Sequence, residues 1–241
     1  MWFDNDLLRI IYLPSVLIPV IFPIFSNDLT VVQVLPWLVG WSFLLIHANL
    51  FNDFIDKDRK LPVSGKALAS ISLIFLTFGL FILADKIVYA GIFVALFFVH
   101  NLLTSRHIYS DIPVQVAAIT MPYLATASFI DAKLFSFFLA LSIIAMFIDR
   151  LVDEKMNKAE FRRLRVVTLL SVLTFIGFLL YLLVTDASYR FLSPFMIMLL
   201  GILTAVYTGR LSLKLKIVSI YGSNAFLFYL IAILATLGKF V

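Results

Sequence analysis

Carboxylate and amide side chains recur at helical spacing at one point of the chain. Asn49, Asn52, Asp53 and Asp56 stand at positions i, i+3, i+4 and i+7, so on a helix all four project from one stripe. Carboxylates held this close repel one another unless a cation lies between them. Hard oxygen ligands without cysteine or histidine favour Mg²⁺ over zinc.

A second acidic cluster follows further along the chain. Asp149 and Asp153 share a helix face at i, i+4. Taken singly, each acidic residue is also typical of a solvated helix end at the lipid headgroups. Two such clusters at equivalent helix ends predict instead that they converge on one shared cation, across a single cavity. The predicted Mg²⁺ ligands are Asn49, Asp53, Asp56, Asp149 and Asp153.

The predicted metal site implies a phosphate-bearing substrate. Mg²⁺ in proteins usually keeps several waters and is completed by one or two carboxylates and by substrate phosphates. Basic side chains in or beside the same segments would hold a diphosphate through charge-assisted hydrogen bonds. The predicted diphosphate-binding residues are Asn49, Asn52, Arg59, Lys66, Arg106 and Arg150.

Composition determines the environment in which this chemistry takes place. Of the 241 residues, 63% are hydrophobic and 14% are charged, against about 25% charged in a soluble domain. Stretches such as SISLIFLTFGLFILA are apolar on every face, unlike the alternating strands of a membrane barrel. The chain has no cysteine, which excludes a thiolate nucleophile and cysteine-ligated metal sites.

The apolar runs predict an all-α, polytopic membrane protein. Nine runs are bounded by charged or turn residues, and a span needs about 20 apolar residues. We expect a single domain of nine transmembrane helices around a central, lipid-accessible cavity, with a pseudo-repeat over 1–110 and 111–210 and a last helix at 214–238. The runs lie at about 7–26, 30–52, 67–84, 87–105, 112–130, 132–152, 164–185, 189–208 and 214–238.

Charge placement predicts the orientation. Counted by loop, all but four of the nineteen Lys and Arg residues fall on one side of the nine predicted helices. The positive-inside rule then places the N-terminus and the acidic loops in the cytoplasm and the C-terminus on the opposite side. We therefore predict membrane lipid, and no nucleic acid, as the surroundings of the basic loops. The four residues on the other side are Lys86, Lys133, Arg190 and Lys239.

Two stretches resemble the signatures of the UbiA superfamily of intramembrane prenyltransferases. NLFNDFID at 49–56, followed by RKLPVSGK at 59–66, is similar to the family pattern NxxNDxxDxxxD and its basic RPLxSGR-type stretch. Asp149 and Asp153 match the second, DxxxD-type signature after the sixth of nine helices. The last aspartate of the first signature falls at Lys60, and of the family's Tyr and Lys-Arg after the fourth helix only Arg106 is kept.

The resemblance implies an activity. Asp53, Asp56, Asp149 and Asp153 would be the catalytic residues, acting with Mg²⁺ on an allylic prenyl diphosphate, whose prenyl group passes to an acceptor. The acceptor is a quinone-precursor aromatic or another lipid, and its identity stays open.

Two other functions remain open from the residues. A UbiA-type membrane terpene cyclase would ionise the same diphosphate without an acceptor. A nonenzymatic lipid-binding or transport protein would keep the helices, although transporters commonly place polar residues near the midplane and the acids here stand at helix ends. His47, His100 and Asn101 are left outside the predicted site, because polar residues within spans commonly bridge helices.

Overall fold

The computed structural model describes residues 13–26, 29–56, 63–103, 119–127, 130–151, 158–208 and 213–240; within the helices, the side chains at 26, 56, 101–103, 149–150 and 213–222 are outside the description. The described part is helical and contains no strand. Its helices are α1 Pro14–Ser26, α2 Val31–Asp56, α3 Gly65–Ile82, η3 Ala84–Lys86, α4 Ile87–Leu103, a helix at 119–126, α6 Ala132–Leu151, α7 Lys158–Thr185, η4 Ala187–Leu192, α8 Ser193–Thr208 and α9 Leu213–Thr236.

Among the described residues, four helical segments are long and apolar enough to cross a membrane. They are Val31–Ile55, Gly65–Ile82, Lys158–Thr185 and Ala187–Thr208. The all-helical class and the membrane-compatible character predicted from composition are confirmed. Each of the nine apolar runs contains helix within the described part, but nine crossings stay a prediction.

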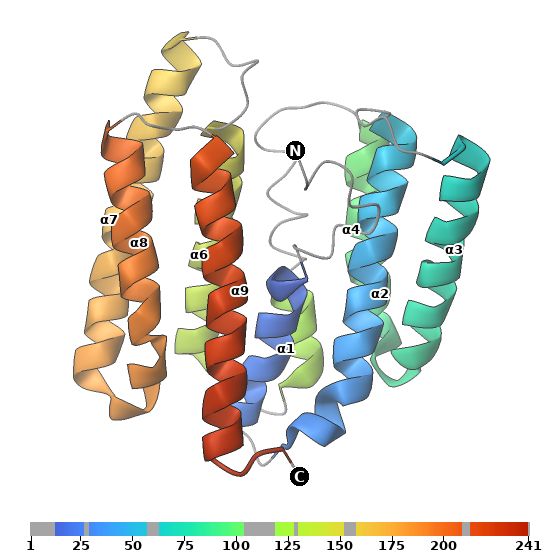
Figure 1. Cartoon of the computed structure of the whole chain (residues 1–241), viewed down its shortest axis with the longest axis horizontal. Helices are drawn as coiled ribbons and strands as arrows, with labels where there is room; N and C mark the ends of the chain where they lie inside the picture. The colour runs from blue at the N-terminus through green and yellow to red at the C-terminus, as the bar shows by residue number, and fades with distance from the viewer. Residues whose placement is uncertain are drawn as a thin grey trace. The chain divides into compact units, whose positions relative to one another are not determined.

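The chain divides into two compact units. The first comprises residues 1–130 and 233–241, and the second comprises residues 131–232. In the first unit, α2 packs along α3 and also contacts α1 and α4 (Figure 1). In the second unit, α7 contacts α6, η4 and α8 (Figure 1). Each unit is thus organised around one long helix.

The core of the second unit is aromatic. The ring of Phe137 on α6 lies 5.1 Å from that of Phe175 on α7 and 5.2 Å from that of Phe195, at the start of α8. Phe195 in turn meets Phe226 of α9 edge to face at 4.0 Å. Such edge-to-face pairs gain energy beyond the area that they bury, so these rings fix α6, α7, α8 and α9 to one another.

Glycine allows α2 and α3 to approach closely. A Cβ added at Gly79 of α3 would lie 2.7 Å from Leu44 Cδ2 and 3.2 Å from the carbonyl oxygen of Gly40 on α2. Leu44 is fully buried, so it has little room to move. Small residues at such contacts let helix backbones come together where lipid supplies no hydrophobic drive for association.

Gly79→Ala should therefore destabilise the protein, by about 1–3 kcal/mol as expected for overpacking a filled interface. Thermal unfolding in detergent measures the effect. Gly91→Ala on α4 is the matched control, since a Cβ there meets nothing within 4 Å. Equal melting temperatures for the two variants would contradict the close-packing argument.

Candidate functional site

The first acidic motif occupies the last two turns of α2. Asp53 is buried, with 4% of its surface exposed, while Asn49 and Asn52 are half-buried. The Nδ2 atom of Asn49 is itself buried and has no hydrogen-bond partner in the described part of the chain. A buried donor without an acceptor is costly, so the amide of Asn49 is suited to an acceptor from outside the protein, such as a phosphate oxygen.

One face of α2 carries contacts with α3. Phe43 packs against Phe75 with ring centroids 5.3 Å apart, His47 bonds to α3, and Leu50 belongs to a core cluster with residues at the start of α3. These α2 positions follow one another at i, i+4 and i+7, which is one stripe of a helix.

The polar motif begins at the edge of that interface. On a helical projection with 3.6 residues per turn, Asn49 falls on the side of α2 away from His47, whereas Asp53 follows Leu50 by three residues and so stands beside the α3 contact. Asp53 is buried, so this edge of α2 faces the protein interior rather than open surface.

The start of α3 lies beside the end of α2. Ser64 caps α3 by accepting a hydrogen bond from the amide of Ala67 at 3.2 Å. Gly65 lies within van der Waals reach of Phe54 on α2, because a Cβ at this glycine would stand 3.8 Å from the Phe54 ring. Lys66 is exposed in the first turn. The fold therefore brings the start of α3, with Lys66 in its first turn, beside the helix end that carries Asp53.

The other predicted site residues fall partly or wholly outside the description. Asp56 belongs to α2, and Asp149 and Arg150 belong to α6, but their side chains are outside the described residues. Arg59, Arg106 and Asp153 lie outside the described residues altogether. The meeting of the two acidic motifs in one cavity stays a prediction. Among the side chains that are described, no three carboxylate, histidine or cysteine groups are gathered as metal ligands.

His47 links α2 to α3. Its Nδ1 lies 2.8 Å from the Ser72 hydroxyl and 3.0 Å from the Ser72 carbonyl oxygen. The Ser72 hydroxyl in turn donates to the carbonyl oxygen of His47 at 3.3 Å. The imidazole also stacks on Phe51, at 5.8 Å between ring centroids. These bonds support the assignment of His47 as an interhelical packing residue.

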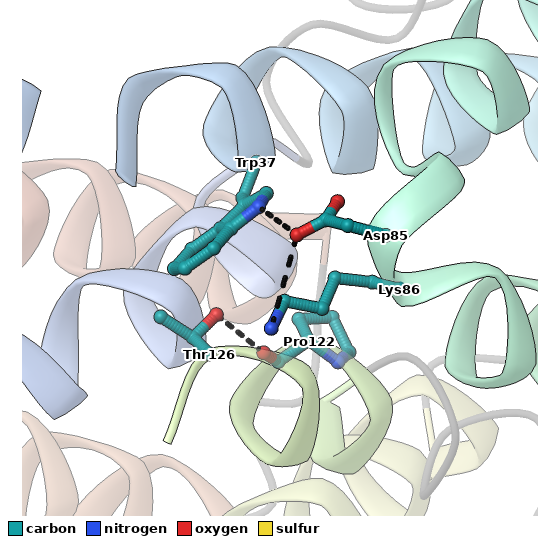
Figure 2. Close-up of polar contacts among 5 residues, drawn as sticks. All are labelled: Trp37, Asp85, Lys86, Pro122 and Thr126. Atoms are coloured by element: carbon teal, nitrogen blue, oxygen red, sulfur yellow. Dashed lines mark hydrogen bonds and ion pairs between the residues drawn. The ribbon is translucent and has the colours of Figure 1, made fainter. Parts of the chain in front are cut away.

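An aromatic, acidic and basic cluster at the opposite end of α2 was missed from the sequence. The indole Nε1 of Trp37 donates to Asp85 Oδ2 at 3.2 Å, and Lys86 Nζ lies 3.8 Å from the same oxygen (Figure 2). The Lys86 ammonium also lies 4.6 Å from the centre of the Trp37 ring. A tryptophan near the start of an apolar helix, followed by an Asp-Lys pair after the next helix, is the signal that would have indicated this cluster.

The second unit contains a similar cluster. The hydroxyl of Tyr189 in η4 donates to Asp131 Oδ2 at 2.6 Å, and Lys133 Nζ lies 5.4 Å from the centre of the Tyr189 ring. Asp131 Oδ1 meanwhile accepts the backbone amide of Lys133 and so caps α6. Hydrogen bonds from Ser188 also lower the pKa of Asp186, at the start of η4, below its ordinary value.

The His47–Ser72 link predicts a measurable contribution to stability. Ser72→Ala removes the hydroxyl between the two helices and should destabilise the protein by about 1–3 kcal/mol, read as a lower melting temperature in detergent. Ser70→Ala, at an exposed position of the same helix, is the control and should change little. A melting temperature of Ser72→Ala equal to that of the control would show that the link is not structural.

No protein-family model, curated protein or solved structure matches this chain.

Proposed function

We propose that this protein is an intramembrane prenyltransferase of the UbiA type. It transfers the prenyl group of an allylic diphosphate to an acceptor in the presence of Mg²⁺. The observation that carries the proposal is the buried Asp53, one turn after Asn49, whose buried amide has no hydrogen-bond partner among the described residues. Two further features support the proposal: the helical spacing of the first motif, and the position of the start of α3 beside the end of α2.

The donor set fits a magnesium ion. Carboxylate and amide oxygens are hard ligands of the kind that Mg²⁺ prefers, and the residues that would hold it are Asn49, Asp53, Asp56, Asp149 and Asp153. The ion would supply positive charge for the departing diphosphate.

The chain's own residues have separate tasks in the proposed reaction. The Asn49 amide donates a hydrogen bond to a diphosphate oxygen, and Lys66, with Arg59, Arg106 and Arg150, adds positive charge beside it. The allylic C–O bond breaks, with its electron pair leaving on the diphosphate. The acceptor nucleophile then bonds to the allylic carbon and loses a proton to solvent or a nearby base.

The allylic cation needs surroundings that exclude water and tolerate positive charge. The chain has 25 Phe, 9 Tyr and 3 Trp residues, whose rings could line such a cavity. Aromatic faces attract cations, and apolar surroundings strengthen every charge interaction within the site. The same rings would also accommodate the apolar tail of the donor.

The proposed topology has nine crossings, with the N-terminus and both acidic motifs on the cytoplasmic side. It is supported by the distribution of Lys and Arg, since only four of the nineteen fall on the other side of the predicted spans.

Activity is the first test. Purified protein is incubated with labelled prenyl diphosphates of several lengths and a panel of aromatic and lipid acceptors, with and without Mg²⁺. Prenylated acceptor that forms only with Mg²⁺ supports the proposal. A cyclised product without acceptor indicates the cyclase, and intact diphosphate in every reaction contradicts both enzyme functions.

Asp53→Asn should lower Mg²⁺-dependent turnover by about a hundredfold or more, because metal affinity and leaving-group stabilisation are lost together and each 1.4 kcal/mol is worth about tenfold. Product formation under saturating donor measures the loss. Asp85→Asn is the matched control, since it removes a carboxylate from the other end of the α2–α3 pair. Equal turnover in the two variants would contradict the assignment of Asp53.

Single cysteines test the topology in a chain that has none of its own. Ala84→Cys and Lys158→Cys place thiols at exposed positions on opposite predicted sides. A membrane-impermeant maleimide should label Ala84→Cys in intact cells and Lys158→Cys only in inside-out vesicles. Labelling of both from the same side would contradict the nine-helix topology.

A further inference from the structure

A groove runs between α7 and α8 in the second unit. The two helices lie side by side (Figure 1). The groove has a volume of about 520 Å³ and is lined by Val166, Leu170 and Leu173 of α7 and by Thr204 and Tyr207 of α8, among others. Its walls are almost wholly apolar side chains, so it is suited to a hydrocarbon chain.

The groove begins where the apolar part of α7 begins. Residues 158–165 carry all the charged residues of the helix, and from Val166 to Val184 it has none. At 1.5 Å per residue this apolar stretch is about 28 Å long, close to the thickness of a bilayer core. The groove therefore opens at headgroup level, and from Val166 to Leu173 it extends about 10 Å into the core.

A basic residue continues the same stripe of α7 beyond the groove. Arg162 precedes Val166 by four residues, and Val166, Leu170 and Leu173 follow at i+4, i+8 and i+11, so Arg162 lies one turn before the groove on the same face of α7. Arg162 and its neighbour Arg163 are exposed. An exposed guanidinium matches a phosphate group in charge and in hydrogen-bond geometry.

Arg165, one turn after Arg162, binds the end of α8 beside the groove. The Nε of Arg165 donates to the carbonyl oxygen of Val206 at 2.9 Å, and its Nη2 donates to that of Tyr207. These carbonyls belong to the last turn of α8, where no amide of the helix can reach them. Arg165 therefore holds Tyr207 at the same end of the groove as Arg162.

We propose that this groove binds one acyl chain of an anionic phospholipid, whose phosphate contacts Arg162. The apolar walls contact the acyl chain. The groove is about 10 Å deep, which corresponds to the part of one leaflet nearest the headgroups. Arg162 favours a headgroup with a net negative charge. The site is separate from the proposed catalysis and does not depend on it.

Native mass spectrometry of the detergent-purified full chain tests the proposal with two added lipids, phosphatidylglycerol and phosphatidylcholine of the same acyl chains. We expect one phosphatidylglycerol to be retained in preference to phosphatidylcholine. Arg162→Gln should weaken phosphatidylglycerol binding about fivefold, the factor for losing about 1 kcal/mol of attraction per basic residue, and leave phosphatidylcholine unchanged. Arg190→Gln, which removes an exposed arginine at η4, is the charge-matched control.

A second pair of variants tests the location. Leu170→Trp fills the groove and should abolish retention of the lipid, whereas Leu180→Trp, at an exposed position of α7 outside the groove, should retain it. Equal retention of the two lipids, equal loss in the two arginine variants, or full binding by Leu170→Trp would each overturn the proposal. Preferential retention of uncharged farnesol over phosphatidylglycerol would also overturn it, by identifying a prenyl chain as the occupant.

Discussion

The close contact between α2 and α3 fixes the described part of the candidate site. Gly40 and Gly79 remove side chains where the helices meet, and His47 and Ser72 join them further along. Because α3 covers the face of α2 that carries His47, Asn49 is left on the other side, and Asp53 stands at the edge of the contact, three residues after Leu50. The same contact brings the capped start of α3 to the helix end that carries Asp53. A helix pair packed at another rotation would turn Asn49 and Asp53 towards different surroundings.

Local patterns predicted the helices and the common side of the polar motif. The apolar runs coincide with helices in the described part of the chain, because backbone amides and carbonyls in lipid must be satisfied within one segment. Helical spacing likewise placed Asn49 and Asp53 on one side of α2. Both features depend on residues only a few positions apart, and such features can be derived from a sequence alone.

Contacts between distant residues could not be derived in this way. Ser72 follows His47 by 25 residues, and Asp85 follows Trp37 by 48. In a soluble helix the apolar stripe indicates the face that packs, but α2 is apolar around most of its circumference and offers no such stripe. The rotation of one helix against another depends on side-chain shape, which periodicity does not encode. The groove between α7 and α8 was not predicted for the same reason.

The two lysine clusters have an electrostatic consequence for the membrane. Lys86 and Lys133 are two of the four basic residues on the predicted non-cytoplasmic side, and each lies over an aromatic ring that donates to a carboxylate. The four basic residues of that predicted side are matched by four aspartates, Asp28, Asp85, Asp131 and Asp186. The formal net charge of +5 therefore falls wholly on the predicted cytoplasmic side, where an anionic leaflet would meet it.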